Sequence, residues 1–151
     1  MKVGVISDTH GLLRPEAVAA LRGVERILHA GDVGDASILD QLGQVAPVTA
    51  IRGNIDGSGP CARLPETEWV ELAGCNLYML HDVHALDLDP VAAGLLVVVS
   101  GHSHNPLIER KKGVLYFNPG SAGPRRFSLP ISLGFLEIAD GKIVPSLVTI
   151  G

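Results

Sequence analysis

The most constraining feature of the sequence is a short apolar run near its start that stops abruptly at polar residues. Residues 3–6 read Val-Gly-Val-Ile, and Ser-Asp-Thr-His-Gly follows them at positions 7–11. A run rich in Val and Ile that Gly terminates predicts a buried β-strand. A strand that ends in this way places a carboxylate, Asp8, and an imidazole, His10, two residues apart at its mouth. Both side chains can there turn toward one metal ion.

The same design recurs along the first half of the chain. The expected elements are helices over about 12–22 and 35–42 and strands over 26–30 and 45–51. Alternation of strand and helix predicts right-handed parallel crossovers. In open sheets of this kind, functional sites gather at the carboxyl ends of the strands. We therefore expect the residues that follow these strands to converge, namely Asp8, His10, Asp32 and Asn54.

The second half of the chain predicts a mostly antiparallel arrangement. Hairpins are expected over 68–80, 107–117 and 134–150, with an apolar strand over 95–100, loops over 57–65 and 124–130, and a short helix or turn within 87–94. The last hairpin turns at Asp140-Gly141, a strong two-residue turn signal. Two of these strands also end in imidazoles, at His81 and at His102-Ser103-His104. Because no repeat or linker interrupts the chain, we expect one domain over residues 1–151.

Composition narrows the functional classes. The 151 residues are 46% hydrophobic and 19% charged, which is typical of an ordinary globular domain, and the formal net charge of −4 argues against a nucleic-acid partner. No apolar run approaches the ~20 residues that span a bilayer, so no membrane partner is expected. The start of the chain lacks the features of a secretory leader, and Cys61 and Cys75 are expected to be reduced thiols. These observations predict a cytoplasmic protein.

Seven polar side chains stand at or near strand ends, and they are candidate metal ligands: Asp8, His10, Asp32, Asn54, His81, His102 and His104. Oxygen and imidazole ligands without thiolates suit manganese, iron, zinc, nickel or cobalt. Seven groups are too many for one ion of ordinary coordination number. They suit two ions that share one bridging carboxylate.

Five separated motifs carry a resemblance to a known family. In order along the chain they are Asp8-Thr9-His10, Gly31-Asp32, Gly53-Asn54-x-Asp56, His81 and Gly101-His102-Ser103-His104. This ordered set resembles that of the calcineurin-like metallophosphoesterases. The small size of the chain and the segment Asn118-Pro119-Gly120-Ser121 are similar to the small bacterial and archaeal phosphodiesterases of the YfcE type. The resemblance implies an α/β four-layer sandwich, in which two mixed β-sheets pack face to face with helices outside.

The resemblance also implies roles for individual residues. Asp8, His10 and His104 would bind a first metal, Asn54, His81 and His102 a second, and Asp32 would bridge the two. Two divalent ions, with manganese favoured over nickel, iron, zinc or cobalt, would clamp phosphoryl oxygens and generate a bridging hydroxide that attacks phosphorus. We expect Asp32, Asn54 and His102 to take part in catalysis. Arg125 or Arg126 would hold the phosphate, because arginine binds it bidentately.

Two positions depart from the family pattern. Many relatives have histidine after the asparagine, where it is thought to protonate the leaving group, whereas this chain has Ile55. Many also have glycine after the fourth motif, where this chain has Asp82. With Ile55 at the first of these positions, either the leaving group must be a good one or another acid or a water must protonate it, which favours diesters with a stabilised leaving alkoxide. Both changes also lie in the direction of the family's retromer-subunit relatives, which look like binding modules rather than enzymes.

The sequence therefore favours a phosphodiesterase that acts on small phosphodiesters. The alternatives are a phosphomonoesterase or nucleotide phosphatase with the same metals, and a non-catalytic binding module. A homo-oligomer is possible, and no stable nucleic-acid partner is expected.

Four further polar residues lie in or near these motifs. His29 lies within an apolar strand and is expected to be a core histidine, and His84 to be a surface or supporting residue. Asp56 would either orient a ligand or form a local turn. Ser121 is not expected to be a nucleophile.

Overall fold

The computed structural model describes all 151 residues, and its two five-stranded sheets are both mixed. The first sheet has the order β10-β9-β1-β2-β3 and contains β1 (Lys2–Ile6), β2 (Arg26–His29), β3 (Val48–Ala50), β9 (Ser132–Ala139) and β10 (Lys142–Thr149). Strands β1, β2 and β3 run parallel, β9 pairs antiparallel with β1, and β10 pairs antiparallel with β9. The parallel crossovers expected from the first half of the chain are thus confirmed.

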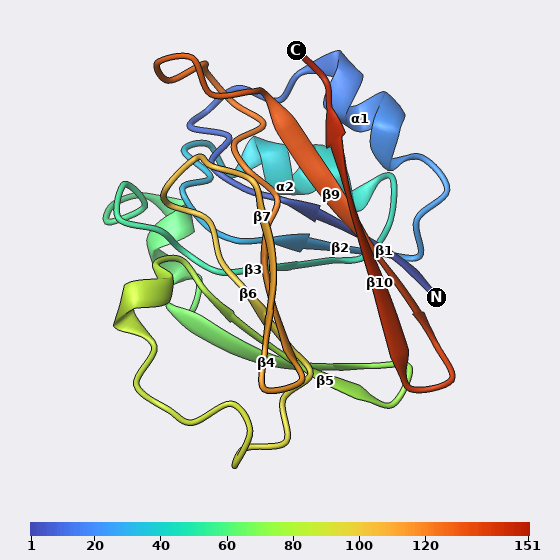
Figure 1. Cartoon of the computed structure of the whole chain (residues 1–151). Coiled ribbons are helices and arrows are strands. Elements are labelled where there is room, and N and C mark those ends of the chain that lie inside the picture. Colours follow the sequence, from blue (N-terminus) through green and yellow to red (C-terminus); the bar gives the residue numbers. More distant parts are fainter.

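The second sheet has the order β4-β5-β6-β8-β7. Its strands are β4 (Thr67–Leu72), β5 (Cys75–Leu80), β6 (Val97–Val99), β7 (Leu107–Lys111) and β8 (Val114–Asn118). Each end is an antiparallel hairpin, and the central strand β6 pairs in parallel with β5 and β8. Figure 1 shows the two sheets facing each other, with the hairpin β9–β10 forming one edge of the first sheet.

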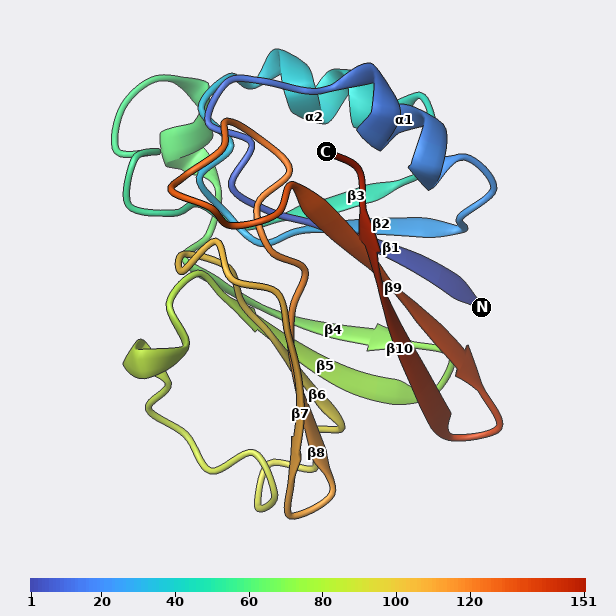
Figure 2. The ribbon, with the colours of Figure 1, turned by 45° about the horizontal axis from the view of Figure 1, so that its top comes forward.

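Two short helices cover the outer face of the first sheet, as Figure 2 shows. Helix α1 (Pro15–Leu21) begins with a proline, whose fixed φ suits the first turn, and buries Ala17 and Leu21 one turn apart. Helix α2 (Ser37–Gly43) buries Ile38 and Leu42 with the same spacing. This spacing sets one apolar stripe of each helix against the sheet.

The outer face of the second sheet has no helix over it. The segment between β5 and β6 covers it instead, with one 3-10 turn, η2 (Val83–Ala85), and a turn near residues 90–94. The sandwich class is confirmed, and its fourth layer is made of irregular chain. Another 3-10 turn, η1 (Pro60–Arg63), lies within the region expected to be a loop.

Three apolar clusters hold these layers together. The largest has 17 buried residues between the two sheets, the second has 13 under the helices, and a small one of four lies beneath the covering segment of the second sheet. Val, Leu and Ile dominate all three. Both cysteines are buried and unpaired, and no helix is long and apolar enough to cross a membrane.

Candidate metal centre

The ends of strands from both sheets meet at one edge of the sandwich, on the left in Figure 2. The loops that follow β1, β2, β3, β5 and β6 lie there, and they carry all seven candidate ligands. Five of these ligands have left-handed backbone conformations: Asp8 (φ 55°), His10 (φ 46°), Asp32 (φ 55°), His102 (φ 70°) and His104 (φ 61°). Such conformations are unfavourable for residues other than glycine and concentrate at functional sites. The surrounding structure must hold these loops in place.

Asp8 faces three imidazoles with a single oxygen atom. Its Oδ1 lies 3.3 Å from Nε2 of His104, 3.6 Å from Nε2 of His10 and 3.8 Å from Nε2 of His81. The other oxygen, Oδ2, accepts hydrogen bonds from the Ser7 hydroxyl and from the backbone N–H of His102. Oδ1 itself is buried and has no hydrogen-bond partner, and the same is true of Nε2 of His10. Buried polar atoms without partners are costly, and a cation among them would satisfy both.

The two carboxylate oxygens of Asp32 also have different neighbours. Oδ1 accepts the backbone N–H of Ile55 at 3.0 Å. Oδ2 lies 3.4 Å from Nε2 of His10 and 3.2 Å from Nε2 of His81. One oxygen therefore anchors the carboxylate while the other stands between imidazoles from two different loops. This is the position that a bridging ligand would take between two ions.

Asn54 completes the cluster from the loop after β3. Its side-chain oxygen lies 3.3 Å from Nδ1 of His102, and this end of the amide also lies 3.1 Å from Nε2 of His81 and Oδ2 of Asp32. All these neighbours are able to accept hydrogen bonds, so without an ion the amide would gain by turning its NH₂ toward them. This end of the amide could equally present its oxygen to a cation shared with these neighbours. The donor set thus fits divalent ions with a preference for oxygen and imidazole.

The charges of Asp8 and Asp32 are those that metal ligands require. Burial alone would raise the pKa of Asp8, but its contacts with His10, His104 and Ser7 outweigh that effect and lower the pKa far below the usual range. For Asp32, burial is likewise outweighed by His81 and the Ile55 N–H, so its pKa is lowered. Both side chains are carboxylates at neutral pH.

His81 has a fixed orientation. Its Nδ1 lies 2.7 Å from the backbone carbonyl of Ala30 and donates to it, which leaves Nε2 to face the carboxylates. Burial lowers the pKa of His81, but Asp32 and the Ala30 carbonyl outweigh burial and raise it. A bound cation would compete with that proton for Nε2.

Residues outside the candidate ligand set hold the loops together. Asp56 is almost fully buried, and its carboxylate accepts the backbone N–H groups of Val33, Gly34 and Gly53 at 2.9–3.0 Å. It thereby ties the loop of Asp32 to the loop of Asn54. Of the two roles considered for Asp56, the structure supports positioning of the ligand loops rather than a merely local turn.

Asn118 and Ser121 support the loops that follow β6 and β1. The Asn118 amide donates to the Gly101 carbonyl at 2.9 Å and to the Ser103 hydroxyl at 3.1 Å. The Ser121 hydroxyl donates to the Asp8 carbonyl at 2.9 Å, so it is committed to the backbone. Sequence reasoning gave Asn118 no role. Its place at the end of an apolar strand, as a polar residue, is the signal that could have found it.

The remaining predicted residues fall into two groups. Arg125 and Arg126 line a small cavity of about 170 Å³ whose other walls include His10 and His104. Arg125 donates to the carbonyl of Leu129 in its own loop. His84 is exposed and contacts Asp82 through its backbone N–H. The arginines therefore border the candidate metal centre, whereas His84 is not among the clustered ligands.

The two departures from the family pattern have little effect on the backbone. Ile55 is 45% exposed, and its N–H helps to orient Asp32. Asp82 has φ −112°, so this position has no left-handed conformation that would favour glycine. Its Oδ2 lies 3.9 Å from Nε2 of His102. His81 keeps its place in the cluster despite the aspartate that follows it.

A mixed-sheet sandwich with carboxylates and imidazoles at its strand ends defines a class of metal-dependent phosphoesterases. The family model described as "Calcineurin-like phosphoesterase superfamily domain" matches residues 1–141. A Methanothermobacter thermautotrophicus protein named "Probable metallophosphoesterase" is 38% identical over 100% of this chain and 94% of its own. The chain belongs to the calcineurin-like phosphoesterase superfamily.

Two solved structures place the chain more closely within this fold. The phosphoesterase YfcE of Escherichia coli superposes with a TM-score of 0.72 at 27% identity over the whole of both chains. A zinc-containing vacuolar protein sorting 29 protein of Entamoeba histolytica superposes with a TM-score of 0.75 over the whole of both chains. At 23% identity the second likeness concerns the fold alone.

Proposed function

We propose that the protein is a dinuclear-metal phosphodiesterase that hydrolyses small phosphodiesters. The observation that carries the proposal is the position of Asp32, whose Oδ2 stands 3.4 Å from His10 and 3.2 Å from His81. The names of the relatives support a phosphodiesterase, since a 28% identical protein of Methanocaldococcus jannaschii and YfcE of Escherichia coli are both named as such. The proposal treats residues 1–151 as one domain.

The side chains divide into two sets around Asp32. Asp8, His10 and His104 would hold one ion and Asn54, His81 and His102 the other, with manganese favoured. The geometric grouping of Asp8 with His10 and His104 supports the first set. A second group joins Asp32 and His81 with Asp8, so Asp8 also lies next to the second set. When bound, two such ions supply Lewis-acid stabilisation of the phosphoryl oxygens and a water of lowered pKa.

The chain's own residues would orient the substrate. Arg126, and Arg125 beside it, border the cavity next to His10 and His104 and would neutralise the phosphoryl group. His102 is the most exposed imidazole of the cluster, with a side chain 45% accessible, and would face the substrate. Asn54 is neutral, which limits repulsion of an anionic ester. Ile55 has no proton to give, so esters whose alcohol leaves readily are the favoured substrates.

Hydrolysis of bis(4-nitrophenyl) phosphate by the manganese-loaded protein tests the proposal. Asp32→Asn should lower kcat at least ~100-fold, because Asp32 would contact both ions, and His102→Ala should do so by a similar factor. The exposed carboxylate of Asp40 in α2 offers a matched control, and Asp40→Asn should retain activity. Full activity in Asp32→Asn and His102→Ala would contradict the proposal.

The competing function is a binding module that catalyses no reaction. This alternative is kept because the fold is similar to that of the vacuolar protein sorting 29 protein. Metal content does not discriminate, because that relative was itself solved with zinc. Turnover does. A protein that binds manganese but cleaves neither bis(4-nitrophenyl) phosphate nor 4-nitrophenyl phosphate would be a binding module. Cleavage of the monoester alone would indicate a phosphomonoesterase.

A further inference from the structure

A cavity of about 560 Å³ lies beside the candidate metal centre and shares no lining residue with the small cavity of the two arginines. Strands β7 and β8 form its floor, the turn around η2 forms one wall, and the loop of His102 closes one end. None of the roles assigned so far uses this cavity. Its volume is within the range of sites for small organic ligands.

Strand alternation builds the floor of the cavity. Leu107, Glu109 and Lys111 alternate along β7 and line the cavity together, whereas Ile108 and Arg110 between them do not. Tyr116 from β8 lies beside them, and Val83 and Leu86 from the covering segment stand opposite. Four steps along β7 correspond to ~13 Å at the usual rise of a strand. The cavity is therefore long enough for a ring and the atoms that attach it to phosphorus.

The cavity is continuous with the candidate metal centre. His102 lines it, together with Gly101 before it and Asp82 from the loop after His81. The Asn118 amide, which fixes the loop of His102, belongs to the same wall. A phosphoryl group held at His102 would therefore direct one of its ester groups into this space.

The charges of the cavity favour an uncharged occupant. Asp82 and Glu109 bring two carboxylates, and the Lys111 ammonium is 3.5 Å from Glu109 and 5.3 Å from the centre of the Tyr116 ring. The cation is thus already engaged, and a second phosphate would meet uncompensated negative charge. Leu86, Leu107 and Tyr116 offer apolar contact instead.

We propose that this cavity binds the uncharged organic group of a phosphodiester, namely an aromatic ring carried on the alcohol, as in an aryl or a nucleoside ester. The inference rests on the proposed function, because it assumes that a phosphoryl group is held at the metal centre. It names Leu107 as a residue that determines substrate specificity.

Binding of two phosphonates to the manganese-loaded protein tests this inference. Phenylphosphonate and methylphosphonate share the same anionic head and differ only in the organic group. The wild-type protein should bind phenylphosphonate ~10-fold more tightly by calorimetry, the gain expected from burying a ring. Leu107→Trp fills the cavity and should reduce that preference to less than ~3-fold. Ile108→Trp, at the adjacent position that does not line the cavity, should leave it unchanged; the two residues are 44% and 42% exposed.

Thymidine 5′-monophosphate distinguishes the two sources of the ring. Tighter binding than phenylphosphonate, lost in Leu107→Trp, would identify a nucleoside ester, and weaker binding would identify an aryl ester. Equal affinity for the two phosphonates, or a preference that Leu107→Trp leaves intact, would overturn the inference. These binding measurements do not need turnover, so absence of hydrolysis would reject the proposed function without deciding this one.

Discussion

The Nε2 atom of His29, within β2, lies 3.0 Å from the hydroxyl of Thr9, which stands between two candidate ligands at the end of β1. The Thr9 hydroxyl donates to the Val33 carbonyl, so it accepts from His29. On the other side of the ring, Nδ1 accepts the backbone N–H of Gly31 at 3.2 Å. His29 is therefore a neutral, fully satisfied core histidine, as its apolar strand predicts, and it joins the loops of Asp8 and Asp32.

This environment predicts a loss of stability in mild acid. Burial lowers the pKa of His29 from 6.5 to about 4, because a second proton would charge a buried ring and would face the Gly31 N–H. The unfolded chain takes up that proton near pH 6.5, whereas the folded chain does so only near pH 4. The contribution is thus complete above pH 6.5 and is lost as pH falls to 4, by at most about 3 kcal/mol. Urea unfolding of metal-free protein between pH 7.5 and 4 measures it.

The variant His29→Gln isolates the effect of this residue. It should be less stable than the wild type at pH 7.5, and the difference between the two proteins should shrink as the pH falls to 4. The raised pKa of His81 acts with the opposite sign, since its contribution is present at low pH and is lost as pH rises through the folded pKa. That contribution is common to both proteins and cancels in the comparison. A constant difference across the pH range would refute the assignment.

A second prediction concerns the contact between Gly53 and Asp32. A Cβ at residue 53 would overlap the carboxylate and the backbone nitrogen of Asp32. Gly53→Ala should therefore displace Asp32 and weaken manganese binding at least ~10-fold, the effect typical of disturbing a ligand's support. Gly57→Ala is the matched control, because a Cβ there meets nothing within 4 Å. Calorimetric titration with Mn²⁺ compares the three proteins, and identical affinities would show that the close approach does not matter.

Much of the fold followed from local patterns in the sequence. Apolar runs ended by glycine located the parallel strands, and Asp140-Gly141 located the turn between β9 and β10. The predicted ends of two strands differ from the observed ends. Residues 45–51 and 95–100 predict strands longer than β3 and β6. Apolar residues next to these strands are also buried, although they lie outside the paired segments. An apolar pattern predicts burial, so it predicts a strand that is too long. The sequence pattern did not predict the strand order β5-β6-β8, because pairing within the sheet depends on contacts between residues distant in sequence.

The candidate site shows where sequence reasoning stops. Residue type and position at the end of a strand predicted the seven candidate ligands, and the structure brings these side chains together. The sequence could not show that Asp8 and Asp32 each use one oxygen as an anchor and the other to face imidazoles, since this depends on backbone N–H groups from distant loops. The role of Asp56 was similarly undecided. Its three hydrogen-bond donors come from segments that only the fold brings together.

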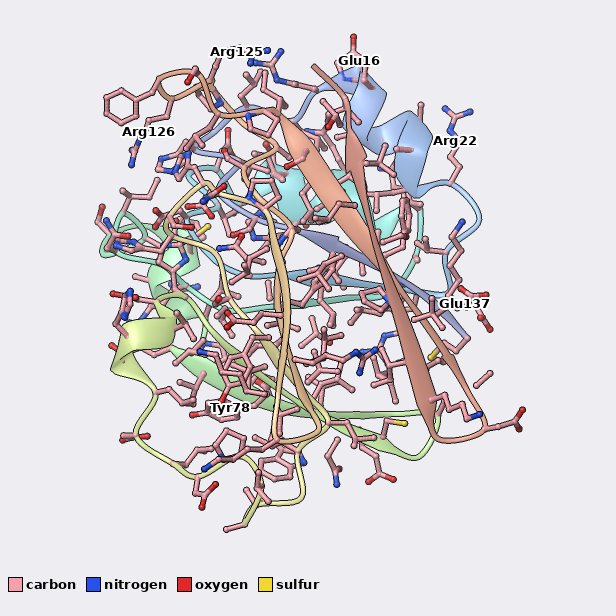
Figure 3. All side chains as sticks on the ribbon, viewed as in Figure 1. Glu16, Arg22, Tyr78, Arg125, Arg126 and Glu137 are labelled. Atoms are coloured by element: carbon pink, nitrogen blue, oxygen red, sulfur yellow. The ribbon has the colours of Figure 1, made fainter.

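The last prediction separates substrate binding from metal binding at the arginine loop. Arg126 borders the cavity beside His10 and His104, and its side chain makes no hydrogen bond within the chain, whereas the Arg125 side chain donates to the Leu129 carbonyl. Arg126→Ala should raise KM for bis(4-nitrophenyl) phosphate ~10-fold, with kcat and manganese affinity little changed, because it removes a contact to the phosphoryl group in both the ground and transition states. Arg22, at the opposite side of the molecule in Figure 3, provides the control, and Arg22→Ala should change none of these quantities. An unchanged KM in Arg126→Ala would remove this residue from the substrate site, and a fall in manganese affinity would show instead that the loop supports the ligands.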